Sequence, residues 1–299
     1  MRPVHGMISE DELRSDCVRV FLRCLLVCAA VINGNAVAEV LRLDGPMQQG
    51  ALVIGTVEPG ARIQLDGKSV RVTPEGRFAI GFDRDAKATA KLTAIYADGR
   101  KETRALTIAR REYDVQSVTG VPQQTVEPPP SVLARIEREA KLVAAARAVD
   151  SNLLSFLDGF AWPLTGRISG IYGSQRIYNG KPGRPHYGVD VAAPVGRRVR
   201  APADAVVTLA EPDLFFSGGT LIMDHGYGVS STFMHLSKLL VKKGDRVRVG
   251  DEVAEVGATG RASGPHLDWR INWFNVRLDP QLIAPPMPAA GPMAATPTH

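Results

Sequence analysis

The sequence predicts a mainly β protein with a small N-terminal β-sandwich, a linker helix and a C-terminal, glycine-rich β domain. Three observations support this prediction. The length of 299 residues suits about two domains. The 29 glycines and 21 prolines make long, unbroken helices few, and short apolar runs repeatedly end in turn dipeptides. The 44% hydrophobic and 22% charged residues are ordinary for a globular protein and exclude disorder throughout the chain.

Residues 1–38 have the pattern of an export signal. Arg19 and Arg23 precede an apolar run at 24–32, and small residues at 36–38 permit cleavage after Ala38. The run is shorter than the roughly 20 residues that cross a bilayer, and no later segment approaches that length. We therefore expect a periplasmic or secreted protein without a stable membrane span after removal of the signal.

All three cysteines, Cys17, Cys24 and Cys28, lie in this segment. The remaining chain therefore has no disulfide framework, no cysteine-type zinc site and no thiol nucleophile. The alternatives to cleavage are an uncleaved N-terminal anchor or a wrongly assigned start. A lipid-modified Cys28 is less favoured, because the bulky Val27 stands where a small residue is expected.

Residues 39–113 are predicted to form the β-sandwich. Pro-Gly, Asp-Gly and Glu-Gly turns separate short runs of alternating polarity. The module contains no histidine or cysteine, so we expect a binding or spacing role rather than catalysis. The predicted strands are 52–57, 62–65, 69–72, 77–80, 91–97 and 100–108.

Residues 114–158 are predicted to be a linker and a helix. The linker is polar and ends in three prolines at 128–130, which makes it semi-rigid. Ser131 can cap the helix that follows, and the helix is expected to pack against a neighbouring domain. Its apolar stripe comprises Val132, Ile136, Leu142 or Val143, Val149 and Leu153. Short strands and glycines return at 159–284, and the Pro/Ala-rich tail at 285–299 is expected to be disordered.

Four of the six histidines fall in the C-terminal domain, at positions 186, 225, 235 and 266. The other two lie in the signal and at the last residue. One such histidine is usually structural, but four in one β domain indicate a site.

The local contexts of three of these histidines suggest a cation site. His186 and Asp190 are four residues apart and can reach one cation, with Gly188 between them. His266, Asp268 and Arg270 alternate along a predicted strand, so their side chains share one face. His235 ends another alternating strand. Nitrogen and oxygen ligands with one open position are the arrangement that activates water at neutral pH.

A series of short motifs extends this pattern along residues 162–282, about two fifths of the chain. They include Trp162-Pro163, His186-Tyr187-Gly188-Val189-Asp190, Asp224-His225-Gly226-Tyr227-Gly228, Met234-His235-Leu236-Ser237, Val256-Gly257-Ala258-Thr259-Gly260 and Gly264-Pro265-His266-Leu267. In this order they resemble the lysostaphin-like, or LytM-type, zinc metallopeptidase family of peptidoglycan endopeptidases.

The resemblance implies a LytM-type antiparallel β domain with a metal cleft that holds one Zn²⁺. His186 and Asp190 match metal ligands of the family, and Asp268 stands at the position of the third ligand. His235 and His266 match the catalytic pair, one a general base and the other a stabiliser of the oxyanion. The implied function is that of an exported zinc metallo-endopeptidase that hydrolyses peptide bonds of peptidoglycan.

The third ligand position departs from the family, which has the second histidine of a His-x-His pair there. An aspartate oxygen can also ligate zinc, so a His, Asp, Asp set remains competent. Two carboxylates would make the bound water a weaker acid and other divalent metals more competitive. The opposing interpretation is that Asp268 pairs with Arg270 and the cation site is lost. The protein would then be an inactive LytM-like domain that binds wall polymer or regulates partner cell-wall hydrolases.

Other candidate residues receive weaker predictions. His225 lies in an apparent turn, where a structural hydrogen bond is expected. Tyr172, Tyr187 and Trp273 could line the cleft or pack in the core. No nucleic-acid partner is expected despite the net charge of +5, because the chain lacks an aromatic platform and a recognition helix. A basic stretch that could attract anionic wall polymer comprises Arg167, Arg176, Lys181, Arg184, Arg197, Arg198 and Arg200.

Overall fold

The structure, a computed structural model, describes residues 41–118, 129–178 and 180–288. The predicted signal at 1–38 and the end of the predicted tail, 289–299, lie outside the described residues. The described part of the chain is mainly β, as the sequence predicts, with largely antiparallel strand pairing and one α-helix. No helix in these described ranges has the length and apolarity needed to cross a membrane.

The N-terminal module has seven strands in two antiparallel sheets. One sheet has the order β1 (Leu41–Asp44), β2 (Leu52–Val57) and β5 (Arg77–Gly81). The other has the order β4 (Lys68–Val70), β3 (Arg62–Leu65), β6 (Thr89–Ile95) and β7 (Lys101–Thr107). Phe78 and Ile80 from the first sheet share one buried core with Ile63 and Leu92 from the second. This shared core explains why the runs of the second sheet alternate in polarity, since that sheet buries one face. The first sheet buries residues on both faces, because Leu52 and Ala79 belong to the large core of the C-terminal domain.

The chain after this module is not entirely linker. Strand β8 (Val115–Val118) pairs in parallel with β10 (Gln175–Tyr178), which also pairs with β11 (Lys181–Pro182). The prediction of a linker from residue 114 is therefore wrong for these four residues. Its failure has a physical reason: a parallel partner far away in sequence leaves no hairpin turn to signal the strand.

Helix α3 (Pro130–Arg147) begins and ends earlier than predicted. Pro129 is its cap residue and Pro130 its first residue, so Ser131 is not the cap. Proline suits this position because its φ is already helical and its missing N–H would lack an intrahelical partner there. The helix ends before Val149 and Leu153, so these two do not extend its stripe.

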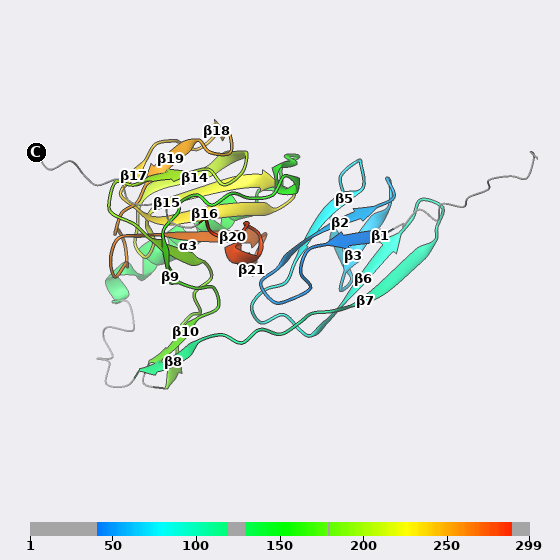
Figure 1. Ribbon diagram of the computed structural model, residues 1–299, viewed down its shortest axis with the longest axis horizontal. Helices are drawn as coiled ribbons and strands as arrows, with labels where there is room; N and C mark the ends of the chain where they lie inside the picture. Colours follow the sequence, from blue (N-terminus) through cyan, green and yellow to red (C-terminus); the bar gives the residue numbers. More distant parts are fainter. Residues whose placement is uncertain (1–40, 119–128, 179, 289–299) are drawn as a thin grey trace, which may run out of the picture. The chain divides into compact units, whose positions relative to one another are not determined.

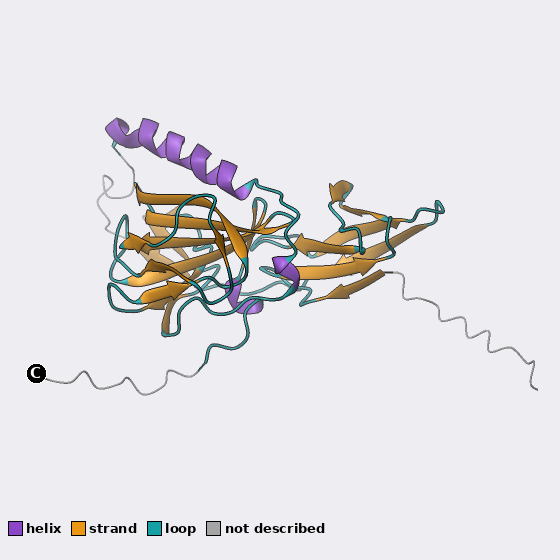
Figure 2. Cartoon of the chain, turned by 90° about the horizontal axis from the view of Figure 1, so that it is seen from above, coloured by secondary structure: helices purple, strands orange, loops and turns teal. Residues whose placement is uncertain are grey.

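The helix packs against the C-terminal domain, as predicted (Figure 2). It contacts β14 (Ala205–Leu214) and β15 (Gly218–Gly226). Val143 and Ala146 of the helix join a small apolar cluster with Leu209, Leu214 and Ile222.

The C-terminal domain is built on an eight-stranded antiparallel sheet (Figure 1). Its order is β18 (Arg246–Val247), β14, β15, β16 (Val229–Leu236), β20 (His266–Trp273), β12 (Val189–Ala192) and β9 (Arg167–Gly170), with β21 (Val276–Leu278) beside β20. A second sheet has the order β13 (Arg198–Arg200), β19 (Glu252–Glu255) and β17 (Lys238–Leu239).

Strand β20 separates the two faces of the main sheet. Leu267, Trp269 and Ile271 are fully buried in the large hydrophobic core. Asp268 and Arg270 alternate with them and therefore project from the opposite face, which we call the site face. The predicted alternation of this strand is confirmed.

The beginning of the predicted tail is ordered by packing. Trp162 donates a hydrogen bond from Nε1 to the carbonyl oxygen of Pro285 at 2.6 Å. Ile283 and Met287 contact the large core, and Ala284 is buried. The prediction of disorder from residue 285 is thus wrong for these first residues, because aromatic and apolar partners far away in sequence hold them.

The described residues, 41–118, 129–178 and 180–288, belong to one compact unit. Arg111, just after the N-terminal module, donates from Nη1 to the buried Asp279 carboxylate at 2.8 Å. Arg84 donates from Nε to the carbonyl oxygen of Gly173 at 2.8 Å. The Tyr113 ring lies edge-on to Tyr172, with centroids 6.2 Å apart. These contacts tie the N-terminal module and the residues just after it to the loop that precedes β10 and to the segment that follows β21.

Candidate active site

Two aspartates face each other across neighbouring strands. The antiparallel register of β12 and β20 places Asp190 directly opposite Asp268. Two glycines make room for these carboxylates. A Cβ at Gly170 would collide with the Asp190 carboxylate, and one at Gly188 would lie 2.5 Å from Asp268 Oδ1. These two positions therefore need glycine because a side chain would collide with the carboxylates, and not because of a positive φ.

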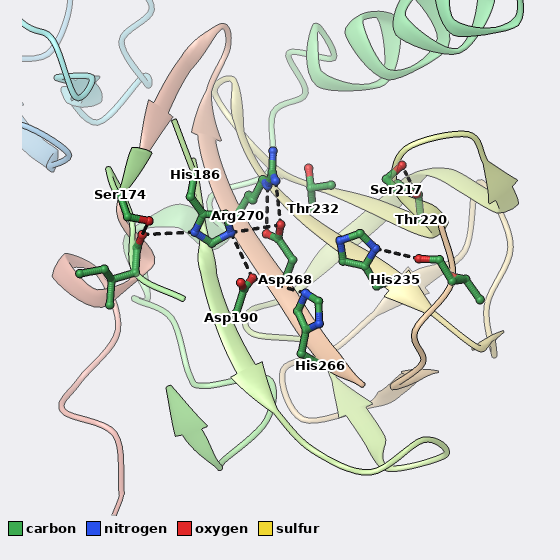
Figure 3. A network of polar contacts seen from close by, with 12 residues as sticks. Ser174, His186, Asp190, Ser217, Thr220, Thr232, His235, His266, Asp268 and Arg270 are labelled. Carbon is green, nitrogen blue, oxygen red and sulfur yellow. Dashed lines mark hydrogen bonds and ion pairs between the residues drawn. The ribbon is translucent and has the colours of Figure 1, made fainter. Parts of the chain in front are cut away.

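His186 completes a cluster of three donors with these aspartates. Its Nδ1 donates to the carbonyl oxygen of Ile171 at 3.2 Å, which orients the ring. Its Nε2 lies 3.1 Å from Asp190 Oδ1 and 3.3 Å from Asp268 Oδ2. In Figure 3 the three side chains point toward one another. One ligand atom from each lies within 4.8 Å of the others.

The donor set has the chemistry of a divalent-cation site. Asp190 Oδ1 is buried and accepts no hydrogen bond, although it lies beside the His186 ring. A buried carboxylate oxygen without a donor is costly unless a cation or water satisfies it. One imidazole nitrogen and two carboxylates are ligands that zinc accepts. The residues present therefore fit a metal ion.

Without a metal, His186 carries a proton. Burial lowers the pKa of His186, but its close contacts with the Asp190 and Asp268 carboxylates outweigh burial and raise the pKa to about 10. A cation bound at Nε2 would have to replace this proton, because a ligating histidine must be neutral there.

Arg270 pairs with Asp268, as the opposing interpretation of the sequence anticipated. Nε donates to Oδ1 at 2.9 Å and Nη2 to Oδ2 at 2.7 Å. Burial raises the pKa of Asp268, yet the Arg270 guanidinium outweighs it and holds that pKa well below its usual range. The pair does not remove Asp268 from the cluster. A carboxylate has about four lone-pair sites and Arg270 uses two of them, so Asp268 keeps capacity for a cation.

The two other candidate histidines lie next to this cluster. The ring centroids of His235 and His266 are 4.8 Å apart. Nδ1 of each donates to a backbone carbonyl at 2.8 Å, that of Thr259 and of Gly264 respectively. These hydrogen bonds fix the orientation of each ring and leave Nε2 as its second nitrogen, free of these carbonyl contacts. Nε2 of His266 lies 3.7 Å from Asp190 Oδ1, which places the pair beside the three donors.

An unusual backbone conformation at His235 sets the direction of its side chain. Its φ is 64°, in the region that favours glycine, and the register of β15 and β16 shifts between Gly219 and Leu221. Such irregularities often redirect a side chain at a functional site. Burial lowers the pKa of His235, so the ring is neutral near pH 7.

Sequence reasoning missed Arg147 and Thr232. Arg147 is the last residue of α3, and its Nε and Nη2 donate to Thr232 Oγ1 at 3.4 and 3.3 Å. Thr232 lies opposite Arg270 in the register of β16 and β20, so it belongs to the site face. Burial, with the nearby Arg270 and Arg277, lowers the pKa of Arg147 to about 9. The sequence contains no local signal for this contact, because the helix and the strand are far apart along the chain.

His225 is structural but does not lie in a turn. It is on β15 and fully buried on the core side of the sheet. Its Nδ1 lies 2.9 Å from the carbonyl oxygen of Asp204 and its Nε2 2.8 Å from Ser231 Oγ. Burial lowers its pKa to about 4. The glycines at 226 and 228 suggested a turn, whereas the strand continues to Gly226.

The three aromatic residues named as possible cleft residues differ in burial. Tyr172 is buried and donates from its hydroxyl to the carbonyl oxygen of Arg277, and Trp273 packs against the core. Tyr187 is partly exposed beneath the Arg277 guanidinium, 4.3 Å from its ring centroid. It is thus the one of these three aromatic residues that combines exposure with a cation contact.

Part of the predicted basic stretch is neutralised. Arg198 pairs with Glu255 at 2.8 Å, and Arg200 pairs with Glu252 at 2.8 Å. Both glutamates lie on β19, which pairs with β13. The stretch looked unopposed in sequence because these carboxylates come from a distant strand.

Comparison with known proteins gives the family of the chain. Residues 184–280 match the profile of Peptidase family M23. A crystal structure from Pseudomonas aeruginosa that is assigned to peptidase M23 is 31% identical and superposes with a TM-score of 0.62. That match covers 79% of this chain and 94% of the other. The chain belongs to peptidase family M23.

Some curated relatives of this M23 protein are named as peptidoglycan DD-endopeptidases. Peptidoglycan DD-endopeptidase ShyA of Vibrio cholerae is 36% identical over 106 residues, which is 35% of this chain and 24% of the relative. DD-carboxypeptidase/endopeptidase Mpg of Neisseria meningitidis is 37% identical over 105 residues, 35% of this chain and 24% of the relative. The match thus spans about a quarter of the length of these relatives.

Proposed function

We propose that this M23 protein is an exported metallo-endopeptidase that hydrolyses peptide bonds of peptidoglycan. The observation that carries the proposal is the meeting of three metal-type donors with two histidines on one face of the sheet. The name of the Vibrio cholerae relative, peptidoglycan DD-endopeptidase ShyA, supports the substrate class. Export rests on the pattern of residues 1–38, which would bring the protein to the periplasm or outside the cell, where peptidoglycan is found.

His186, Asp190 and Asp268 would hold one divalent ion, Zn²⁺ or a metal of similar preference. The orphaned Asp190 oxygen and the oriented His186 ring support this assignment. When bound, the ion would supply Lewis acidity, which polarises a scissile carbonyl and lowers the pKa of water.

His235 and His266 would move protons at Nε2. Their Nδ1 atoms are occupied by backbone carbonyls, which leaves Nε2 as the working atom of each ring. One of them would accept the proton of the attacking water, and the other, protonated at Nε2, would donate a hydrogen bond to the developing oxyanion. The lowered pKa of His235 keeps its ring neutral and suited to accepting a proton.

The experiment is to measure the metal content of the purified protein and the release of soluble fragments from purified sacculi. Bound metal and fragment release, both abolished by His186→Ala, are the expected result. Arg138→Ala, on the exposed face of α3, is the matched control and should preserve both. A well-folded protein that neither binds metal nor releases fragments would sink the proposal.

The Asp268–Arg270 pair favours a second candidate function, that of an inactive domain that binds wall polymer or regulates partner hydrolases. A guanidinium already neutralises the third donor in this protein. Restoration of metal binding and fragment release by Asp268→His in an otherwise inactive protein would favour this candidate.

A further inference from the structure

Arg147 brings a positive charge to the edge of the site without a carboxylate partner. Its only hydrogen-bond acceptor within the described ranges is the hydroxyl of Thr232, at 3.3 to 3.4 Å. A guanidinium has five N–H donors, so a neutral hydroxyl satisfies few of them. The side chain is nevertheless partly buried rather than extended into solvent.

The position of Arg147 is fixed by its helix. Ala146, its neighbour, is buried in the cluster with Leu209 and Ile222. Near the other end of α3, Arg135 pairs with Asp213 at 3.0 Å, and Glu139 accepts a hydrogen bond from the backbone of Phe215 at 2.8 Å. An anchored helix holds Arg147 beside the sheet, which distinguishes it from a mobile surface arginine.

The surroundings of Arg147 have an excess of positive charge. Arg270 and Arg277 lower the pKa of Arg147. Asp268 is the carboxylate that opposes them, and it already accepts two hydrogen bonds from Arg270. Asp190 faces His186. An arginine kept near like charges is most readily stabilised by an anionic ligand, to which its planar fork can donate two parallel hydrogen bonds.

We propose that Arg147 binds a carboxylate of the substrate peptide and makes the site selective for acidic peptides over their amides. This inference rests on the proposed function, because it names the substrate chemistry of the same site. Thr232 would orient the guanidinium, and α3 would thereby contribute to substrate recognition. Arg147 is a binding residue in this scheme and takes no part in proton transfer.

The experiment compares two peptides that differ only in charge. One is a cross-linked stem-peptide dimer with free carboxylates, and the other is the same dimer with these carboxylates amidated. Binding to metal-stripped protein, followed by calorimetry, avoids cleavage during the measurement. We expect the wild type to bind the free-carboxylate peptide about tenfold or more tightly, as for a charge-assisted hydrogen bond. This preference should shrink with added salt.

Two variants and a control make the test specific. Arg147→Gln should bind the two peptides equally, and Arg147→Lys should retain part of the preference, because it keeps the charge but not the fork. Arg138→Gln removes the same charge from an exposed position of the same helix and should preserve the full preference. Far-ultraviolet circular dichroism checks that each variant is folded, and Arg147→Lys serves if Arg147→Gln is not.

An equal affinity of the wild type for the two peptides, or an unchanged preference in Arg147→Gln, would overturn the inference. So would a full loss of preference in Arg138→Gln. Failure of the proposed function has a different signature. The metal-loaded protein would then release no fragments from sacculi, while the metal-stripped protein still distinguished the two peptides through Arg147.

Discussion

Replacing Gly188 with alanine tests whether space beside Asp268 shapes the site. A Cβ there would lie 2.5 Å from Asp268 Oδ1 and 2.6 Å from the backbone oxygen of Trp269. Ordinary contacts need about 3.5 Å, so strands β12 and β20 would have to separate by nearly an ångström. The backbone of Gly188 does not have a positive φ, so steric conflict is the only effect of the substitution in the folded state.

The expected cost follows from this conflict. Overpacking of a buried site costs about 1–3 kcal/mol, and the reduced entropy of the unfolded chain returns about 0.4–1 kcal/mol. From the middle of each range, Gly188→Ala should lower the free energy of unfolding by about 1.3 kcal/mol. Displacement of Asp268 and Arg270 should also weaken metal binding at least about tenfold, as is found when groups that orient ligands are disturbed.

Urea unfolding followed by tryptophan fluorescence measures the first effect, and calorimetric titration with Zn²⁺ measures the second. Gly264→Ala is the matched control, because a Cβ there meets no atom within 4 Å and its φ is not positive. The reasoning is refuted if Gly188→Ala matches both the wild type and Gly264→Ala in stability and in metal affinity.

Three further predictions concern charge. Burial lowers the pKa of His225 to about 4 from its usual value near 6.5, so protonation between these pH values favours the unfolded chain. The free energy of unfolding of the wild type should therefore fall as the pH drops from about 6.5 to about 4, by up to about 1.4 kcal/mol per pH unit. Urea unfolding at several pH values should show a shallower fall in His225→Gln, and an identical fall would contradict this. Because His186 has a pKa of about 10 without metal, titration with Zn²⁺ at pH 7.5 in buffers of different ionisation enthalpy should report release of about one proton from the protein. No dependence on the buffer would exclude protonated His186. Arg197→Gln should weaken sacculus binding at low salt more than Arg198→Gln, since Arg197 is exposed while Arg198 is already paired with glutamates. Equal effects would show that these pairs do not matter.

Sequence reasoning succeeded where a site residue is placed by local periodicity. The alternation of β20 puts Asp268 and Arg270 on one face and Leu267 and Trp269 in the core, because a strand repeats every two residues. Both hypotheses for Asp268 were visible from the same spacing. The structure shows that pairing with Arg270 and proximity to His186 occur together.

Features that depend on distant partners could not be predicted in this way. The parallel pairing of β8 with β10 joins segments on either side of α3. The contact of Arg147 with Thr232 depends on where the helix docks against the sheet. Ser131 is a residue type that often caps helices, but the helix begins one residue earlier, at Pro130. Pro285 accepts a hydrogen bond from Trp162, which lies near the start of the C-terminal domain.

The pairing of β8 with β10 has a consequence for the order of folding. The segment between these strands contains all of α3, so their contact closes a long loop and is entropically slow to form. The loop from Ile171 to Ser174, which precedes β10, contacts both the ring and the backbone of His186. The main sheet can form by local hairpins such as β15 and β16, whereas the contacts of this loop with Arg84 and Tyr113 form only when the N-terminal module docks. His186 should therefore be among the last residues to reach its native position, after the sheet that carries Asp190 and Asp268 has formed.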